Sequence, residues 1–266
     1  NSMTDNTKML QVIFFALLFG IALVMIDAEK AKPLKDFFTT LDMVVLKIID
    51  LIMSAAPYGV FALLAGLIVD FAGDNPKDAI ELFRALAVYS FTVIFGLGIL
   101  LFIVYPLMIK IIAGISPRKF YQAMGPAQLL AFSTSSSAAT LPVTMDCAEE
   151  RLGVSKEVSS FVLPLGATIN MDGTALYQAV ATLFIAQTMG MELNLNAQLT
   201  IILTSVLASI GSAAVPGAGM VMLVIVLESV GVDPAGIALI FGVDRILDMC
   251  RTTVNVTSDA VCAVLI

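Results

Sequence analysis

The sequence predicts an all-α polytopic membrane protein, and three observations lead to this fold class. Of the 266 residues, 59% are hydrophobic and only 13% are charged, against about 25% charged residues in ordinary globular proteins. The mean hydropathy is +0.98, which implies more apolar surface than a water-soluble globule of this size can cover. The apolar residues also form continuous runs, whereas a membrane β-barrel would alternate polar and apolar residues. Helices fit because they satisfy their own backbone hydrogen bonds in lipid.

Several function classes are excluded by composition. The chain has no histidine, so histidine-dependent catalysis and histidine-ligated metal sites are absent. Cys147, Cys250 and Cys262 lack the spacing of a metal site, and an odd number does not suggest a disulfide framework. The net charge of −7 argues against binding to nucleic acid. Because the sequence begins at Asn1 and ends in an apolar stretch, we expect it to be part of a longer protein.

The first part of the chain predicts helices of different character. Residues 10–26 carry no charge and are long enough for a marginal membrane span. Residues 35–50 predict an amphipathic helix that continues into an apolar stretch at 58–69, and residues 85–109 form the clearest uncharged span. The charges that define the polar side of the amphipathic helix are Lys35, Asp36, Asp42, Lys47 and Asp50.

Two later apolar segments carry tips that a continuous helix would not contain. Residues 120–145 include the hydroxyl-rich run from Ser133 to Ser137, and residues 198–227 include three glycines and a proline between Gly211 and Gly219. A single spanning helix would place these hydroxyls and helix breakers near the bilayer centre. Non-helical backbone is tolerated there only where protein or a watery cavity surrounds it. Both segments therefore predict re-entrant hairpins.

Each predicted hairpin is followed by an apolar segment that contains polar residues. Residues 161–187 contain Asn170-Met171-Asp172-Gly173-Thr174, and residues 235–266 contain several charges and an asparagine. The two halves resemble each other, since Thr168-Ile169-Asn170-Met171 matches Thr253-Val254-Asn255-Val256. Broken hydrophobic segments in both halves of an internal repeat indicate a transporter site at the interface between the repeats.

Asp172 is the only charge between Glu157 and Glu192. A charge near the bilayer centre costs about 2.5–3.5 kcal/mol on insertion scales, and Gly173 beside it suggests an unwound turn. The Asp172 carboxylate, the Asn170 amide oxygen and freed carbonyls are hard oxygen ligands that suit a small cation. The alternative is a helix N-cap or another structural polar contact, because Asn and Asp also favour turns.

The last segment places six polar residues on one stripe of about 100° when it is drawn as a helix. They are Asp244, Asp248, Arg251, Thr252, Asn255 and Asp259. Such a stripe must face a cavity rather than lipid. Arg251 can bind a carboxylate through two hydrogen bonds, and Asp248 can bind an ammonium group, which suits an amino acid with an extra carboxylate. The alternative is an internal ion pair between Asp248 and Arg251, without a ligand.

The predicted hairpin tips add possible anion-binding groups. Backbone N–H groups at Ser135–Ser137 and Val215–Gly219 could bind a carboxylate, as helix N-termini and nests do. Simple flexible turns are the alternative for each tip.

The motifs together resemble those of the dicarboxylate/amino acid:cation symporter family, the glutamate transporter family in its bacterial form. The likeness covers essentially the whole chain. It rests on the serine-rich tip before Thr140-Leu141-Pro142, Asn170-Met171-Asp172-Gly173-Thr174, Ala208-Ser209-Ile210-Gly211 with Val215-Pro216-Gly217-Ala218-Gly219, and Asp248-Met249-Cys250-Arg251-Thr252-Thr253-Val254-Asn255.

This resemblance implies a fold with two re-entrant hairpins and two broken transmembrane helices in inverted repeat. Residues 1–78 would supply scaffold, or trimerisation, helices, and residues 79–266 the transport domain. The expected parts of that domain are one span, a hairpin at about 118–146, a broken helix at about 158–188, a hairpin at about 195–230 and a last helix at about 234–266. The family's first helices are missing from this chain, including one that contributes to its third sodium site.

The resemblance also implies binding roles. The substrate site would be formed by Arg251, Asp248, Asn255, Thr252, Thr174, Ser136, Ser137, Val215 and Gly219. Arg251, assisted by Thr174, would bind the side-chain carboxylate, Asp248 the amino group and Asn255 the main carboxylate. Gly166, Asn170, Asn255 and Asp259 resemble one sodium site. Thr168 with Ser209, Ile210 and Ser212 resembles a second, and Asp172 with Asn170 resembles part of a third.

The expected function is sodium-coupled symport of acidic amino acids by an elevator mechanism, in a homotrimer in the lipid bilayer of a bacterial inner membrane. Sodium would be the coupling ion, and no cofactor, nucleic acid partner or enzyme activity is expected. A proton- or sodium-coupled C4-dicarboxylate carrier is an alternative. So are an intramembrane aspartyl protease using Asp172 and Asp248, and a channel or structural protein. Ser135 and Met249 stand where some relatives have arginine, and Ala138, Ala214 and Ser258 replace the commoner serine or glycine.

Overall fold

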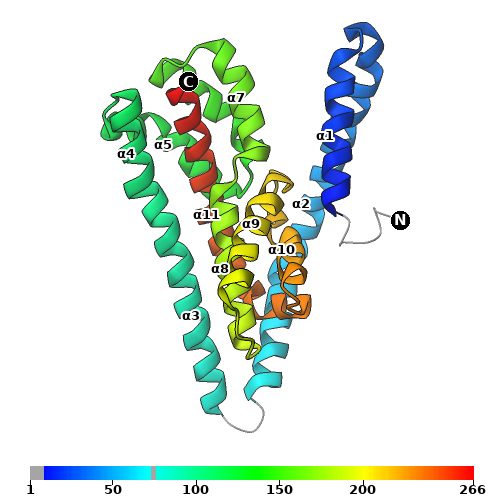
Figure 1. Cartoon of the computed structure of the whole chain (residues 1–266), viewed down its shortest axis with the longest axis vertical. Coiled ribbons are helices and arrows are strands. Elements are labelled where there is room, and N and C mark those ends of the chain that lie inside the picture. Colours follow the sequence, from blue (N-terminus) through cyan, green and yellow to red (C-terminus); the bar gives the residue numbers. More distant parts are fainter. Residues whose placement is uncertain (1–8, 73–75) are drawn as a thin grey trace. The chain divides into compact units, whose positions relative to one another are not determined.

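The prediction of a helical protein is confirmed by the computed structural model, which describes residues 9–72 and 76–266. These residues form helices, and no strand occurs among them (Figure 1). The chain divides into two units, residues 1–65 and 66–266.

The first unit consists of α1 (Met9–Met25) and most of α2 (Ala28–Ala72). The two helices contact each other through Phe19 and Phe38, whose ring centroids lie 5.8 Å apart with an edge-to-face tilt. Large apolar side chains are exposed on both helices, and Val24, for example, is 77% exposed. The predicted polar side of residues 35–50 includes Asp42 and Asp50, whose side chains lie outside the described residues.

After the end of α2, the second unit continues with a long apolar helix that contains two wider turns. It comprises α3 (Pro76–Ile99), a π-helical turn at Leu100–Val104, α4 (Tyr105–Met108) and a second π-helical turn at Ile109–Ala113. Within it, Ile80–Ala113 is long and apolar enough to cross a membrane, the one helix of the described residues that meets both conditions. The span predicted at residues 85–109 lies inside it.

Two helical hairpins occupy the segments where the sequence predicts interrupted spans. The first joins α5 (Pro117–Thr134) to α6 (Ser137–Asp146), which ends in a π-helical turn at Cys147–Arg151. The second joins α9 (Leu195–Ile210) to α10 (Ala218–Ser229). Ser135 in the first tip and Gly217 in the second adopt left-handed backbone conformations, with φ of 54° and 76°. Such conformations stop a helix from continuing.

The first broken helix is present, as α7 (Lys156–Ile169) and α8 (Asp172–Thr188). Asn170 and Met171 leave the helical conformation with ψ of 64° and 58°. The amide of Asn170 still donates to the Gly166 carbonyl at 2.9 Å, which closes α7. The amide of Gly173 donates to the Asp172 carboxylate at 2.9 Å and helps to open α8.

The prediction of a second broken helix was wrong. After a short 3₁₀ turn at Pro234–Gly236, α11 runs without interruption from Ile237 to Leu265. The physical reason lies in its composition. It contains no proline and only one glycine, and its polar side chains reach their partners without backbone being released.

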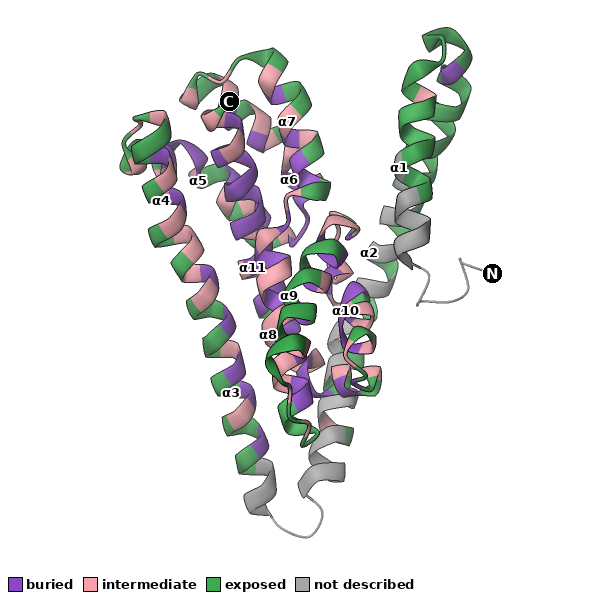
Figure 2. Ribbon diagram, viewed as in Figure 1, coloured by how far each residue is buried: buried purple, intermediate pink, exposed green. Residues whose placement is uncertain are grey.

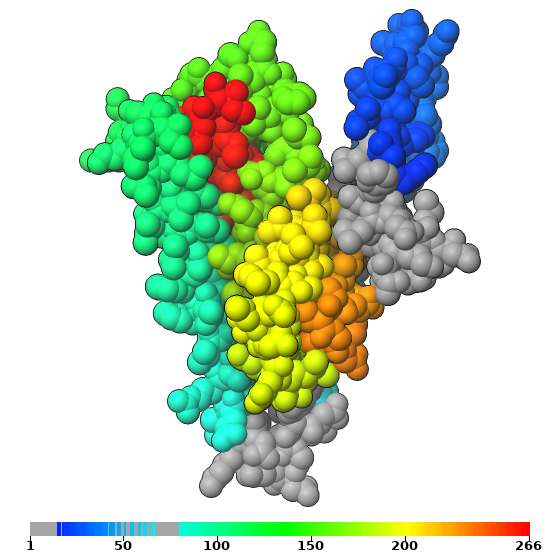
Figure 3. Space-filling model, viewed as in Figure 1, coloured from blue at the N-terminus to red at the C-terminus, as the bar shows by residue number. Residues whose placement is uncertain are grey.

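Helix α11 lies at the centre of the second unit and contacts α3, α5, α6, α7 and α8. Figure 2 shows that it is buried over most of its C-terminal half, in contrast to the largely exposed α9. Figure 3 shows the C-terminal end of α11, in red, at the surface between two green segments of the same unit. The central position of α11 brings its polar stripe against the hairpins and the broken helix.

Candidate functional site

The polar stripe of α11 is buried, as its spacing predicts. Its six members are between 2% and 5% exposed: Asp244, Asp248, Arg251, Thr252, Asn255 and Asp259. Four of them line a small cavity together with both hairpin tips and the start of α8. The cavity is lined by Ser135, Ser137, Met171, Thr174, Ser212, Ala213, Ala214, Val215, Gly219, Asp248, Arg251, Thr252 and Asn255.

The free space inside this cavity is about 10 Å³, room for about one water molecule. Eight of the nine predicted substrate-binding residues line it, and the ninth, Ser136, lies in the first hairpin tip beside it. A ligand as large as an amino acid therefore needs some of the lining groups to move as it binds.

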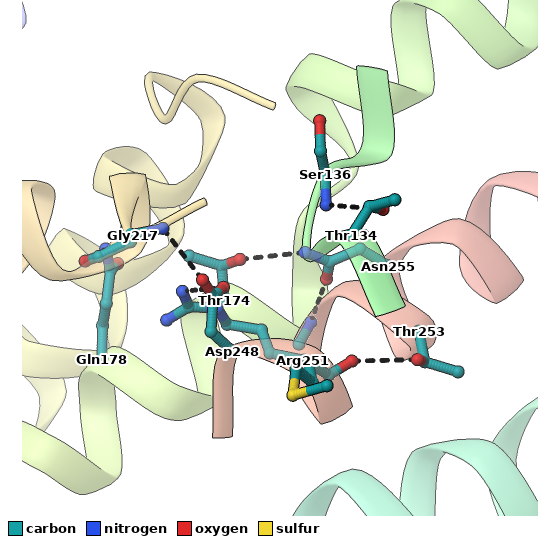
Figure 4. A network of polar contacts seen from close by, with 12 residues as sticks. Thr134, Ser136, Thr174, Gln178, Gly217, Asp248, Arg251, Thr253 and Asn255 are labelled. Carbon is teal, nitrogen blue, oxygen red and sulfur yellow. Dashed lines mark hydrogen bonds and ion pairs between the residues drawn. The ribbon is translucent and has the colours of Figure 1, made fainter. Parts of the chain in front are cut away.

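Arg251 is held from two sides in this cavity. Its Nη2 donates to Asp248 Oδ1 at 2.5 Å, and its guanidinium carbon lies 4.4 Å from the centroid of the Tyr177 ring, which is a cation–π contact. Figure 4 shows Arg251, Asp248 and Asn255 pointing into the same space from α11. The internal Asp248–Arg251 ion pair that the spacing allows is therefore present.

The ion pair does not use all the donors of Arg251. Nη1 of Arg251 is buried and has no hydrogen-bond partner among the described residues. A buried, unpaired guanidinium nitrogen is costly, so it is poised to bind an acceptor that enters the cavity. The guanidinium lies against Gly219, where an added Cβ would be only 2.5 Å from Nη1.

The two hairpin tips contact each other and α11. Ser136 Oγ donates to the Ala214 carbonyl at 2.8 Å, and the Ala138 amide donates to the same carbonyl at 3.2 Å. In the second tip, the Gly217 amide donates to Asp248 Oδ2 at 2.9 Å (Figure 4). The second tip is thus linked both to the first tip and to the aspartate that pairs with Arg251.

Asn255 joins the cavity to the break between α7 and α8. Its side-chain nitrogen donates to Thr174 Oγ1 at 3.0 Å, and its side-chain oxygen accepts from the Gly173 amide at 2.9 Å. Gly173 is required for this approach, because an added Cβ would lie 2.9 Å from that oxygen and 3.1 Å from the Arg251 carbonyl.

A second group of polar residues lies around the same break, and none of its members lines the cavity. The Asn170 side-chain nitrogen donates to Asp259 Oδ1 and to Ser258 Oγ, both at 2.9 Å. Ser258 in turn donates to Asp172 Oδ2 at 3.2 Å, and Asp172 also accepts a hydrogen bond from the Tyr105 hydroxyl. We call Asn170, Asp172, Ser258 and Asp259 the carboxylate cluster.

Gly166 faces the carboxylate cluster, and a Cβ added there would lie 2.6 Å from Asp259 Oδ1. The predicted sodium ligands Gly166, Asn170, Asp172 and Asp259 are therefore brought together, with Asn255 at the edge through Gly173. Their oxygen donors are of the hard type that alkali and alkaline-earth cations prefer. The structure thus fits a cation in this region.

The predicted site at Thr168, Ser209, Ile210 and Ser212 is less developed. Thr168 is exposed and donates to the Leu165 carbonyl at 3.1 Å. Ser209 Oγ donates to the Val206 carbonyl at 2.9 Å. Helices α7 and α9 do contact each other, but the hydroxyls of Thr168 and Ser209 are directed to their own helices.

Sequence reasoning did not identify several residues at the site. Tyr177 and Gln178 on α8 are fully buried, and Gln178 donates to the Gly219 carbonyl at 3.0 Å. Tyr105 reaches Asp172 from another helix. All three are polar residues inside apolar segments, and this feature of the sequence could have identified them. Their partners lie far away in the chain and could not be read from local spacing.

Acidic side chains outnumber basic ones at the site. Asp244, Asp248 and Asp259 are buried and Asp172 is half-buried, whereas Arg251 carries the one buried guanidinium among the described residues. Asp172 and Asp248, which a protease of the aspartyl type would pair, have different partners. Buried charges need compensation, so this arrangement suits bound cations better than a catalytic pair of acids.

Comparison with known proteins agrees with this chemistry. The family model described as "Sodium:dicarboxylate symporter family" matches residues 1–266. Excitatory amino acid transporter 3 of Mus musculus is 46% identical over 257 residues, which are 97% of this chain and 48% of that protein. An excitatory amino acid transporter of Caenorhabditis elegans is 42% identical over 97% of this chain and 50% of its own length. Excitatory amino acid transporter 2 of Homo sapiens is 43% identical over 96% of this chain and 44% of its own.

The chain spans about half the length of the curated relatives it matches. The family and the relatives are transporters rather than enzymes, and symporters of this kind are multi-pass membrane proteins. A match over the whole chain, with identities above 40% to several relatives, identifies the chain as a member of the sodium:dicarboxylate symporter family.

Proposed function

We propose that the protein containing this chain is a sodium-coupled symporter of acidic amino acids. The observation that carries the proposal is the unpaired Nη1 of Arg251 in a small cavity that Asp248 also lines. Opposite charges three residues apart on one helix suit a ligand with both a carboxylate and an ammonium group. The names of the relatives, excitatory amino acid transporters, support the same class of substrate.

In this proposal each polar group of the cavity has a separate task. Arg251 and Thr174 bind the side-chain carboxylate of the substrate, Asp248 binds its ammonium group and Asn255 binds its main carboxylate. Thr252 and the tips at Ser136, Ser137, Val215 and Gly219 complete the pocket. Because Arg251 and Asp248 are paired at 2.5 Å, binding exchanges one internal ion pair for two ion pairs with the substrate.

Entry of the substrate requires the second hairpin to move. The cavity has room for about one water molecule, and the tip that closes it is held by the Gly217–Asp248 and Ser136–Ala214 hydrogen bonds. When a substrate ammonium group binds Asp248, it competes with the Gly217 amide for the Asp248 carboxylate and weakens the hydrogen bond between them. We therefore assign the role of gate to the second tip.

Sodium ions are the coupling ions in this proposal, and no other cofactor is needed. The carboxylate cluster, with Gly166 and Asn255, supplies one cation site and part of another. The segment with Thr168, Ser209, Ile210 and Ser212 forms a further site after a rearrangement of α9. The substrate neutralises Arg251 and Asp248 in the cavity, and sodium neutralises the carboxylates of the neighbouring cluster. Each ligand therefore favours the binding of the other.

A C4-dicarboxylate carrier is the second candidate, because the family description itself names dicarboxylates. A dicarboxylate has no ammonium group, and it would leave Asp248 without its partner once Arg251 turned to the substrate. The burial of Asp248, which is 4% exposed, makes that loss costly. The cavity therefore suits an acidic amino acid better than a dicarboxylate.

The proposed function also implies an arrangement of hairpins, domains and subunits. The hairpins α5–α6 and α9–α10 are re-entrant and related by an inverted repeat, with the single break at Asn170–Met171 in the first half. Residues 1–78 act as scaffold and residues 79–266 as a mobile transport domain in an elevator mechanism. The assembly is a homotrimer in the lipid bilayer. Its location in a bacterial inner membrane rests on the motifs of the sequence, and the relatives compared above are animal proteins.

The test is transport by the full-length protein in proteoliposomes. We expect an inward sodium gradient to drive uptake of labelled aspartate or glutamate, and potassium or choline not to replace sodium. Succinate should not be taken up at comparable concentrations. Uptake of succinate in preference to aspartate would favour the dicarboxylate carrier, and flux without any cation gradient would contradict symport.

The Arg251→Ala variant tests the binding site itself. We expect the binding free energy of aspartate to weaken by about 2–5 kcal/mol, as is usual when one member of a buried charge pair is removed. Isothermal titration at saturating sodium measures it. Unchanged aspartate affinity in this variant would contradict the assignment of the pocket.

A further inference from the structure

Tyr105 is a buried tyrosine whose hydroxyl is directed to the carboxylate cluster. It is 3% exposed and lies in the long apolar helix, 67 residues before Asp172, to whose Oδ2 its hydroxyl donates a hydrogen bond. Ser258 Oγ donates to the same oxygen at 3.2 Å, and the Gly173 amide donates to the other oxygen at 2.9 Å. Three donors from three segments therefore determine how the Asp172 carboxylate is oriented.

The position of Tyr105 depends on the π-helical turn that precedes it. The Tyr105 amide donates to the Leu100 carbonyl, five residues earlier, instead of to the Leu101 carbonyl that an α-helix would use. The next residue is Pro106, which has no N–H group to offer. The Leu101 carbonyl therefore lacks the donors that an α-helical or a π-helical turn would give it.

Tyr121 supplies the missing donor. Its hydroxyl, from the first arm of the first hairpin, donates to the Leu101 carbonyl. A backbone carbonyl without a partner is costly inside a membrane, and Leu101 lies in the helix that is long and apolar enough to span one, so this bond stabilises the wide turn. The wide turn in turn determines the direction in which Tyr105 leaves the helix.

We propose that Tyr105 is a positioning residue for the Asp172 carboxylate in the cation site, and that Pro106 and Tyr121 hold it there by maintaining the π-helical turn. The inference rests on the proposed function, because it assigns Asp172 to a sodium site. It links α5, the apolar helix, α8 and α11 through one chain of contacts: Tyr121 to Leu101, Tyr105 to Asp172, and Ser258 to Asp172. A carboxylate fixed in this way presents its oxygens to a cation without first having to be oriented.

The experiment uses the purified full-length protein in detergent and measures its thermal unfolding at increasing sodium concentrations, with choline keeping the ionic strength constant. A ligand that binds only the folded protein raises the unfolding temperature. Tyr105→Phe keeps the buried ring and removes only the hydroxyl. We expect it to raise by about 10-fold the sodium concentration at which the unfolding temperature begins to increase, as is usual when a group that orients a metal ligand is lost.

Tyr121→Phe tests the second step. We expect a smaller rise in the sodium concentration at which the unfolding temperature begins to increase, and no further rise when Tyr121→Phe is added to Tyr105→Phe, because Tyr121 acts through Tyr105. Tyr58→Phe is the matched control. It removes a hydroxyl from a tyrosine that is 80% exposed in the first unit, and it should leave the sodium dependence unchanged.

The outcomes separate the inference from the function on which it rests. If sodium stabilises the unchanged protein and Tyr105→Phe at the same concentrations, the positioning role is overturned and the proposed function stands. A lower unfolding temperature in choline with an unchanged sodium dependence would likewise show a purely structural hydroxyl. Additive effects of Tyr105→Phe and Tyr121→Phe would overturn the link through the π-helical turn. Absence of any stabilisation of the unchanged protein by sodium would overturn the proposed function and this inference with it.

Discussion

At the scale of single residues, three glycines at this site leave space that polar side chains of α11 occupy. Gly166, Gly173 and Gly219 each stand where an added Cβ would lie within 2.9 Å of a polar side-chain atom on α11. All three have helical backbone, so their conformational freedom is not the reason for glycine. The reason is that the Asp259 carboxylate, the Asn255 amide and the Arg251 guanidinium occupy the space of a side chain.

Gly219→Ala is expected to displace the Arg251 guanidinium. The new Cβ would lie 2.5 Å from Nη1 and 2.7 Å from Cζ, and the guanidinium is held between Tyr177 and Asp248, so it cannot move without losing a contact. Aspartate affinity should fall by about 10-fold or more, which corresponds to an overpacking cost of about 1–3 kcal/mol. Titration calorimetry at saturating sodium measures it. The control is Gly125→Ala, where an added Cβ meets nothing within 4 Å. Wild-type affinity in Gly219→Ala would contradict this packing.

Asp259→Asn is expected to weaken the response to sodium while leaving the shape of the side chain nearly unchanged. In the unchanged protein the Asn170 side-chain nitrogen donates to Asp259 Oδ1 at 2.9 Å. The substitution replaces this buried carboxyl group with an amide. The sodium concentration for half-maximal aspartate binding should rise by about 10-fold or more. The exposed Asp146 on α6 offers a control in Asp146→Asn. An equal rise in both variants would indicate a general effect of charge rather than a cation site.

At the scale of elements, the two hairpins depend on each other. Ser136 has two tasks, because its hydroxyl oxygen accepts from the Ala139 amide at 3.1 Å as the N-cap of α6 and its hydroxyl donates to Ala214 in the opposite tip. The sequence of neither tip predicts that the other tip is its partner. The second tip is joined to α11 in the same way, through Gly217 and Asp248.

Ser136→Ala is expected to loosen the second tip as well as the first. Loss of an N-cap costs about 0.5–2 kcal/mol, and the Ala214 carbonyl would lose one of its two donors. Hydrogen exchange of residues 211–217 should become faster. Ser155→Ala is a matched control, because Ser155 caps α7 by accepting from the Val158 amide at 3.3 Å and has no link to the tips. Unchanged exchange in residues 211–217 would show that the tips are held independently.

For the whole molecule, the main feature is an excess of carboxyl groups over basic groups in the interior of the second unit. Asp248 pairs with the Arg251 guanidinium and Asp244 lies one turn before Asp248 on α11, whereas Asp172 and Asp259 belong to the carboxylate cluster. A cation reduces the cost of ionising these carboxyl groups, and an acidic amino acid adds two carboxylates to the site while bringing one ammonium group. The two ligands should therefore bind cooperatively.

The expected coupling is reciprocal. If saturating sodium raises the affinity for aspartate by a given factor, saturating aspartate must raise the affinity for sodium by the same factor. Titrations of the full-length protein in both orders measure the two factors. Affinities for aspartate that do not change between sodium and choline would contradict the coupling.

Much of this arrangement follows from the sequence alone. The polar stripe of α11 follows from the helical period, since Asp248, Arg251, Asn255 and Asp259 recur at intervals of three and four residues. The break at Asn170–Met171 and the two tips follow from local residue types that oppose helix. Such features depend on neighbours in the chain, and a sequence displays those directly.

Only the tertiary structure decided the partners of these groups. It paired Arg251 with Asp248 under Tyr177, joined Ser136 to Ala214 and placed Tyr105 on Asp172. With the exception of the Arg251–Asp248 pair, these partners lie many residues apart. Their meeting depends on how whole helices pack side by side, and packing is settled by the shape of every contacting surface together rather than by any one segment.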